Sequence, residues 1–173
     1  MRRRTTVLSI AIFSLLIFVA ASEAQAQISW LVEKGPEGSW IGMGAITAPP
    51  TLAGMQFPFM DTYTRAVSAR TGAVLCQMPV ANLEYAGQKM AVAGLGQGNW
   101  IRVSKNNYKF TVARLVLDAT GQPVALAKFN ADVQITDPNT MTGTVTANIY
   151  DWNQNLLMTL EGTLQANRIA VEE

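Results

Sequence analysis

The C-terminal half of the chain, residues 98–169, constrains the fold most strongly because its apolar and polar residues alternate. The alternation is clearest over 142–150 and 156–168. A two-residue period is typical of β-strands that cover one buried face. Short segments rich in Asn, Asp and Gly separate these strands, and such residues favour tight turns. The pattern therefore predicts a series of antiparallel β-hairpins.

The same reasoning, applied to the whole chain, predicts about eight strands. They are expected over 38–47, 59–69, 73–78, 99–104, 108–117, 122–136, 141–150 and 156–171. Closing such a sheet on itself removes its exposed edge strands. We therefore expect an all-β fold, a single eight-stranded antiparallel up-and-down β-barrel. An open two-sheet sandwich is the competing architecture.

Two long apolar connections, 49–58 and 79–98, interrupt the short turns. The second is equally compatible with a helical turn, an extra hairpin or an ordered loop. Alternate connections of an up-and-down barrel fall at the same end, so both long connections are expected at one rim.

The N-terminus has the features of a targeting segment. Arg2, Arg3 and Arg4 precede an uncharged apolar run over 7–21, and small residues follow at Ala24 and Ala26. This order is typical of a cleaved signal peptide. The sequence thus predicts a signal peptide over 1–26, a linker over 27–37 and a β-barrel domain over 38–173. The protein is then exported, to the periplasm or out of the cell; an uncleaved membrane anchor is the alternative.

The charge of the expected mature protein excludes some partners. The full chain has 13 Lys and Arg against 12 Asp and Glu, and removal of residues 1–26 leaves ten against eleven. A nearly neutral domain has no basic surface for nucleic acid or anionic lipid. We expect no nucleic-acid partner and no stable membrane span after signal cleavage. The sequence is compatible with a homo-oligomer.

The chemistry available to the chain is narrow, since it contains no histidine and a single cysteine, Cys76. Histidine-based hydrolysis, an intrachain disulfide and a zinc site are therefore not expected, and neither is a cofactor. Cys76 is interpreted as a small buried apolar residue in a strand. Asp61, Tyr63 and Arg65 share one face of a strand, and a solvated outer face with an ion pair is favoured over an internal polar cluster.

The barrel interior is the expected ligand site. Many residues on the predicted inward faces are small, among them Gly143 and Ala147, and a small barrel lined in this way has room for one modest ligand. The candidate ligand-binding residues are Trp40, Phe57, Tyr85, Phe129, Val145 and Leu160, with the two long connections as lids. The alternative is that large side chains fill the interior.

The segment Gly38-Ser39-Trp40 resembles the Gly-x-Trp opening of lipocalins and the wider calycin barrels. The resemblance implies that Trp40 lies at the closed end of the barrel and that Arg168, from the last strand, packs across its indole. The layout of the hairpins, with Gly98-Asn99-Trp100 before a strand, is also similar to small exported bacterial proteins of unassigned function. At the level of layout only, it is similar to barrels of the allene oxide cyclase type.

Together these features predict an exported barrel that binds a small hydrophobic molecule in its interior. Two alternatives stay open. One is a solid-cored structural or interaction module, and the other is an allene oxide cyclase-like enzyme acting on an apolar substrate. The sequence favours a non-enzymatic role without deciding the question.

Overall fold

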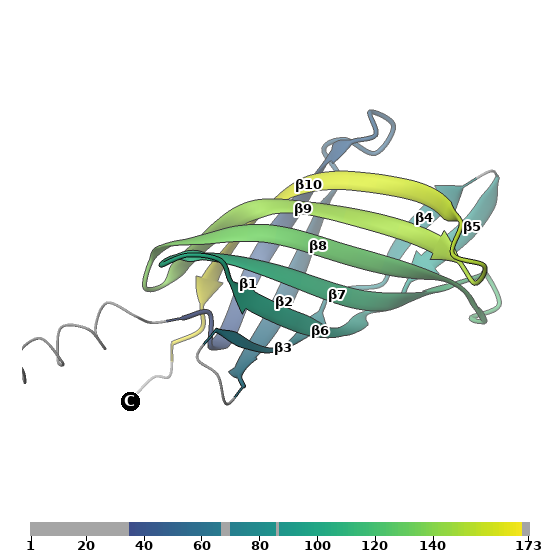
Figure 1. Cartoon of the computed structure of the whole chain (residues 1–173). Coiled ribbons are helices and arrows are strands. Elements are labelled where there is room, and N and C mark those ends of the chain that lie inside the picture. Colours follow the sequence, from purple (N-terminus) through teal and green to yellow (C-terminus); the bar gives the residue numbers. More distant parts are fainter. Residues whose placement is uncertain (1–34, 67–69, 86, 171–173) are drawn as a thin grey trace, which may run out of the picture. The chain divides into compact units, whose positions relative to one another are not determined.

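The computed structural model describes residues 35–66, 70–85 and 87–170, and all structural statements concern these residues. The predicted signal peptide lies outside them. They form ten strands (Figure 1). In chain order these are β1 (Gly38–Ala48), β2 (Gln56–Arg65), β3 (Thr71–Gln77), β4 (Ala81–Tyr85), β5 (Gln88–Val92), β6 (Leu95–Arg102), β7 (Asn107–Leu117), β8 (Pro123–Asp137), β9 (Thr140–Asp151) and β10 (Leu156–Arg168). The described part of the chain contains no helix that could cross a membrane.

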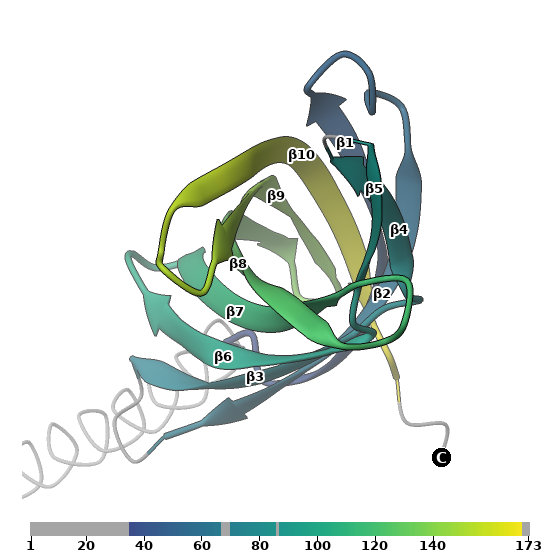
Figure 2. The same cartoon turned by 90° about the vertical axis from the view of Figure 1, so that its right-hand side faces the viewer.

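Eight of the strands close into a barrel, which confirms the predicted fold class. The sheet runs in the order β7-β6-β3-β2-β1-β10-β9-β8, and pairing between β7 and β8 completes the ring. Every neighbouring pair is antiparallel. Figure 2 looks along the barrel from one end and shows this ring of strands.

The two ends of the barrel are named here by their connections. The mouth carries the β1–β2, β7–β8 and β9–β10 connections, and the β4–β5 hairpin extends from the same end (Figure 1). The base carries the β6–β7 and β8–β9 turns, together with the start of β1 and the end of β10. Both long connections therefore lie at the mouth, as the parity of the strands predicts.

The segment 79–98, which the sequence left undecided, contains the β4–β5 hairpin and the beginning of β6. The hairpin continues the β3–β6 pair beyond a bend, where the amide of Met78 donates to the carbonyl of Gly94 at 2.9 Å. Pro79 follows at the bend and has no N–H for the ladder. Beyond the bend, Val92 pairs with Val116 of β7. The hairpin thereby extends the barrel wall at the mouth.

Three aspartates close the turns of the C-terminal meander. The Oδ1 atom of Asp118 accepts from the amides of Thr120 and Gln122 at 2.8 and 3.0 Å. Asp137 and Asp151 make the same kind of contact with amides two residues further on, at 2.8 and 2.9 Å. The pKa of all three aspartates is lowered, mainly by the hydroxyl of Thr120 at Asp118, the amide of Asn139 at Asp137 and the side-chain amide of Asn155 at Asp151, because these donors favour the charged carboxylate.

The interior is packed differently near the base and near the mouth. The cluster toward the base contains large aromatic side chains, namely Trp40, Phe59, Tyr63, Trp100, Tyr108 and Phe110. The cluster toward the mouth is built mainly from smaller or flexible side chains, including Ile46, Val92, Val116, Ala147 and Leu160. The base half is therefore the more fully filled of the two. Most of the room for a ligand lies in the mouth half.

Candidate ligand-binding cavity

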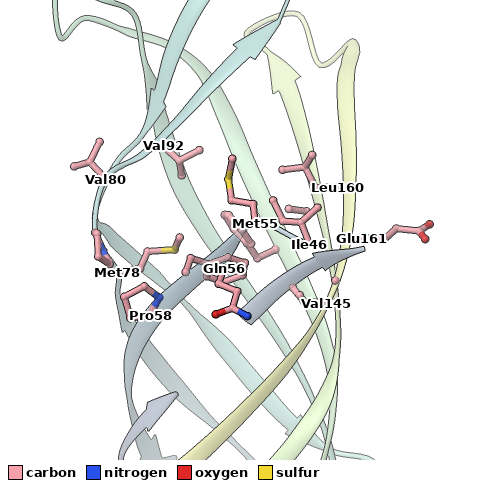
Figure 3. A pocket seen from close by; sticks show the side chains of 15 residues that line it. Ile46, Met55, Gln56, Pro58, Met78, Val80, Val92, Val145, Leu160 and Glu161 are labelled. Atoms are coloured by element: carbon pink, nitrogen blue, oxygen red, sulfur yellow. The ribbon is translucent and has the colours of Figure 1, made fainter. Parts of the chain in front are cut away.

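A cavity of about 170 Å³ lies inside the mouth half of the barrel. Figure 3 shows Met78, Val80 and Val92 on one side of the space and Ile46 and Leu160 on the other. The remaining lining residues are Met55, Gln56, Phe57, Pro58, Pro79, Phe129, Val145, Ala147, Glu161 and Gly162. Glu161, the only charged residue in the lining, is exposed and points away from the space in Figure 3. Apart from the amide of Gln56, the other side chains that bound the space are apolar.

The cavity exists because large and small residues alternate around the ring of strands. Ala147 of β9 lies opposite Phe129 of β8 on one side and opposite Leu160 of β10 on the other. Its methyl group leaves open the space that a larger side chain would fill. Across the barrel, the ring of Phe57 lies over Gly44, where an added Cβ would come within 2.2 Å of the ring. Gly44 therefore lets Phe57 lie flat against the wall.

A second, smaller cavity of about 60 Å³ lies next to the first, toward the base. The two share four lining residues, Phe57, Met78, Phe129 and Val145, which form the boundary between them. Most of the residues that line the lower cavity are apolar, but a small group of polar side chains also contributes to its wall. We call Asp61, Tyr63, Cys76 and Arg114 the floor cluster; Asp61, Cys76 and Arg114 line the lower cavity.

The members of the floor cluster contact one another in a chain. The hydroxyl of Tyr63 donates to Oδ2 of Asp61 at 2.6 Å. Nη2 of Arg114 donates to Sγ of Cys76 at 2.7 Å, and Nη1 of the same guanidinium donates to the carbonyls of Ala93 and Gly94 at 3.0 and 2.9 Å. Arg114 thus connects the floor cluster with the bend that carries the β4–β5 hairpin.

One atom of this cluster has no partner. Oδ1 of Asp61 is buried and accepts no hydrogen bond from any described residue. Asp61 as a whole is 7% exposed and Arg114 is 2% exposed. A buried polar atom without a hydrogen bond costs about 1–3 kcal/mol. Oδ1 is therefore a buried acceptor without a partner, on a residue that lines the lower cavity.

Burial dominates the protonation of the floor cluster. It raises the pKa of Asp61, while the Cys76 thiol, the Tyr63 hydroxyl and the Arg114 charge act in the opposite direction. Burial also raises the pKa of Cys76 to about 12. The thiol is therefore protonated at neutral pH, and a protonated thiol is a poor nucleophile.

The structure corrects two interpretations of these residues. Asp61 and Tyr63 are inside the barrel, so the favoured assignment to a solvated outer face is wrong for them. Only Arg65, at the end of β2, is exposed and ion-paired, with Glu37 at 2.5 Å. Cys76 is half-buried and contacts a guanidinium, so it is not a purely apolar core residue.

Sequence reasoning missed Arg114, although a signal was present. The residue lies on the inward face of β7, in step with Phe110, Val112 and Val116. A charged residue in such an apolar series is almost never fully buried without a partner. Its side chain fits because Gly96 of β6 has none, and a Cβ there would lie 2.8 Å from Cγ of Arg114. Gly96 pairs with Cys76, so the guanidinium reaches across the glycine to the thiol.

At the base, Trp40 and Arg168 are paired across β1 and β10. The guanidinium carbon lies 4.3 Å from the centre of the indole ring. Arg168 also donates to the carbonyls of Pro138 and Gly35, both at 2.9 Å, and to that of Glu37. This contact ties together both ends of the barrel domain and the β8–β9 turn. Residues 35–37, placed in the linker by the sequence, are part of the base.

The predicted ligand-binding residues divide into three groups. Phe57, Phe129, Val145 and Leu160 lie together around the mouth cavity. Trp40 is 0% exposed, donates through Nε1 to the carbonyl of Pro36 at 2.7 Å and lines neither of the two cavities. Tyr85 belongs to β4, and its side chain is outside the described part of the structure.

In the described ranges, no group of three or more Cys, Asp or Glu side chains could hold a metal ion. The two cavities are thus mainly apolar, and the lower one also has the side chains of Asp61, Cys76 and Arg114 in its wall. This arrangement can enclose a small apolar molecule and offer it one hydrogen-bonding group.

Comparisons with known proteins bear on the fold. No protein-family model and no curated protein matches this sequence. Among solved structures, EF1p2_mFAP2b bound to DFHBI is similar to 77% of this chain and 93% of that chain, with 10% identity and a TM-score of 0.51. A redesigned beta barrel is similar over 78% of this chain and 91% of that chain, with 12% identity and a TM-score of 0.49. The likeness to the first, at this identity, concerns the fold alone.

Proposed function

We propose that the protein binds a small apolar molecule in the mouth cavity. The observation that supports this most directly is the apolar chamber of about 170 Å³ beneath the mouth of the barrel. Ligand sites are typically concave and mostly apolar, with a few placed polar groups. The chamber and the floor cluster below it match that description.

The size of the chamber limits the ligand. An apolar cavity of about 150 Å³ is known to bind benzene. A molecule of one ring, or one ring with short substituents, therefore suits this volume. Met55 and Val80, which are 41% and 56% exposed, lie at the rim and offer apolar contacts to any part of a longer ligand that protrudes. A barrel of the same fold, EF1p2_mFAP2b, has been solved with DFHBI bound.

We also propose that the barrel is of the lipocalin or calycin type and that the protein is exported. The first proposal is supported by the contact of Arg168 with Trp40 at the base, because the resemblance at Gly38-Ser39-Trp40 implies such a contact. The basic start, apolar run and small residues over 1–26 support the second. Cleavage of the expressed chain after Ala26, measured by mass spectrometry of secreted or periplasmic protein, would test export.

Binding is tested with toluene as the probe. Saturating toluene is expected to raise the thermal unfolding midpoint, because a ligand at 100 times its Kd stabilises the folded state by about 2.7 kcal/mol. Isothermal titration provides the stoichiometry, expected to be one molecule per chain. Absence of both signals, for toluene and for larger monocyclic probes such as limonene, would refute the proposed function.

A cavity-filling variant locates the site. Ala147→Leu places three more carbons in the chamber, and each buried carbon contributes about 0.8 kcal/mol. The variant is expected to be as stable as the wild type or about 2 kcal/mol more stable, and to lose toluene binding. Ala113→Leu, on the exposed face of β7, is the matched control and is expected to bind normally. Unchanged binding by Ala147→Leu would place the ligand elsewhere.

A further inference from the structure

The lower cavity places three polar side chains, those of Asp61, Cys76 and Arg114, below the mouth cavity in an otherwise apolar lining. It is about 60 Å³ in volume and shares Phe57, Met78, Phe129 and Val145 with the chamber above. A volume of roughly 10–15 Å³ is enough for a water-sized group. A ligand ring in the chamber can therefore extend one small polar substituent past these four side chains into the lower cavity.

The free hydrogen-bonding position in that lower cavity belongs to Asp61. Its Oδ2 already accepts from Tyr63, whereas Oδ1 has no described partner. Both terminal nitrogens of Arg114 already donate, to two backbone carbonyls and to Cys76. The group that is 93% buried, unpartnered and in the wall of the cavity is thus a carboxyl oxygen. It requires a donor.

We propose that the ligand is a small neutral alcohol or phenol whose hydroxyl group donates to Oδ1 of Asp61 while its apolar body occupies the mouth cavity. The inference rests on the proposed function and specifies its ligand class. Asp61 is the residue that would select the hydroxyl group. Phe57 and Phe129 would flank the point where the ligand passes from the apolar to the polar part of the site.

Desolvation disfavours the neighbouring ligand classes. A carboxylate or an ammonium group in the lower cavity would meet one like and one opposite charge, those of Asp61 and Arg114. Either ion would also lose its hydration in a small, mostly apolar space. A hydroxyl group adds no charge, and it can accept as well as donate. It therefore fits the carboxyl group in either protonation state.

The test compares three probes of the same outline, 4-methylphenol, p-xylene and 4-methylbenzoate, by isothermal titration with the full barrel. We expect 4-methylphenol to bind about tenfold tighter than p-xylene, since one hydrogen bond to a charged group contributes at least that factor. We expect 4-methylbenzoate to bind more weakly than either.

Two variants assign the preference to Asp61. Asp61→Leu removes the acceptor at similar size and is expected to abolish the tenfold preference while p-xylene still binds. If that variant does not fold, Asp61→Asn keeps an acceptor for Tyr63 and is expected to reduce the preference at least threefold. Asp132→Asn is the control, because that exposed carboxylate pairs only with Lys109 among the described residues, at 3.1 Å, and the preference should be unchanged.

The outcomes separate this inference from the proposed function. Equal binding of p-xylene and 4-methylphenol would overturn the hydroxyl assignment and leave apolar binding intact. The donor to Oδ1 of Asp61 would then be a water molecule. Tightest binding of 4-methylbenzoate would also overturn it, in favour of an anion held by Arg114. Binding of none of the three probes would refute the proposed function itself.

Discussion

Replacing Arg114 by methionine tests whether the floor cluster is held together by charge. Methionine fills most of the same volume but removes three hydrogen bonds, two to the carbonyls of Ala93 and Gly94 and one to Cys76. It also removes the positive charge that lowers the pKa of the buried Asp61 carboxyl. The barrel would then contain a buried acid with no cation near it.

The expected loss is large for a single substitution. Removing one partner of a buried charged pair typically destabilises a protein by about 3–5 kcal/mol. The lower end of that range is appropriate, because Cys76 lies between the two charged groups and the introduced methionine side chain recovers some packing. We therefore expect the free energy of unfolding at pH 7 to fall by about 3 kcal/mol.

The pH dependence of that loss identifies its electrostatic part. Without Arg114 the folded-state pKa of Asp61 rises further, so the folded protein tolerates the ionised carboxyl less well. The penalty is therefore largest above that raised pKa and shrinks as pH falls toward 3.8, the pKa of the unfolded chain. The part due to the lost bonds to the carbonyls of Ala93 and Gly94 is the same at every pH.

Urea denaturation at pH 7 and pH 4.5 measures both parts, for Arg114→Met, Asp61→Asn and the double variant. A coupling energy of about 1–2 kcal/mol between the two sites is expected at pH 7. Lys109→Met, which breaks an exposed ion pair, is the control and should change stability by about 0.5 kcal/mol or less. A coupling energy below about 0.5 kcal/mol would refute the charge argument.

Three further outcomes are expected. Arg168→Lys loses the planar fork that bonds the carbonyls at the base and stacks on Trp40, so urea denaturation should show a loss of about 2 kcal/mol, and an unchanged midpoint would contradict this. The free energy of unfolding of Asp61→Asn, minus that of the wild type, should rise as pH increases from 3.8 through the raised pKa of Asp61, and parallel pH profiles would disprove that assignment. Cys76 should react slowly with a disulfide reagent at pH 8 and rapidly in urea, since its pKa is about 12; fast labelling of the native protein would contradict its burial.

The sequence was a sufficient guide to the barrel because the signals involved are local. Two-residue alternation and turn residues are properties of neighbouring positions, and the strands they predicted from 108 onward match β7 to β10 closely. The strand predicted over 99–104 covers only the second half of β6, which begins at Leu95. The hairpin over 81–92 was undecided because Gly, Ala and apolar residues there lack a clear period. Its strands are extended because they continue a ladder already set by β3 and β6.

Only part of the candidate site could be predicted from such local signals. Phe129, Val145 and Leu160 could be named from strand parity, because each was expected on an inward face, whereas Phe57 was named as part of the long connection 49–58. The floor cluster could not, since Asp61, Cys76 and Arg114 lie on three different strands. Their association depends on the register of β2 with β3 and of β6 with β7, and on the absence of a side chain at Gly96.

By itself, then, the sequence determined that the chain forms antiparallel hairpins and which faces of them are apolar; the contact of Trp40 with Arg168 was implied by the resemblance at Gly38-Ser39-Trp40. Only the tertiary structure decided that the base half is packed with aromatic rings while the mouth half encloses a chamber. It also decided that a carboxyl group and a guanidinium share the floor beneath that chamber. The physical reason is that alternation fixes which side of a strand a residue occupies, whereas the volume left inside a barrel depends on how side chains from all eight strands meet.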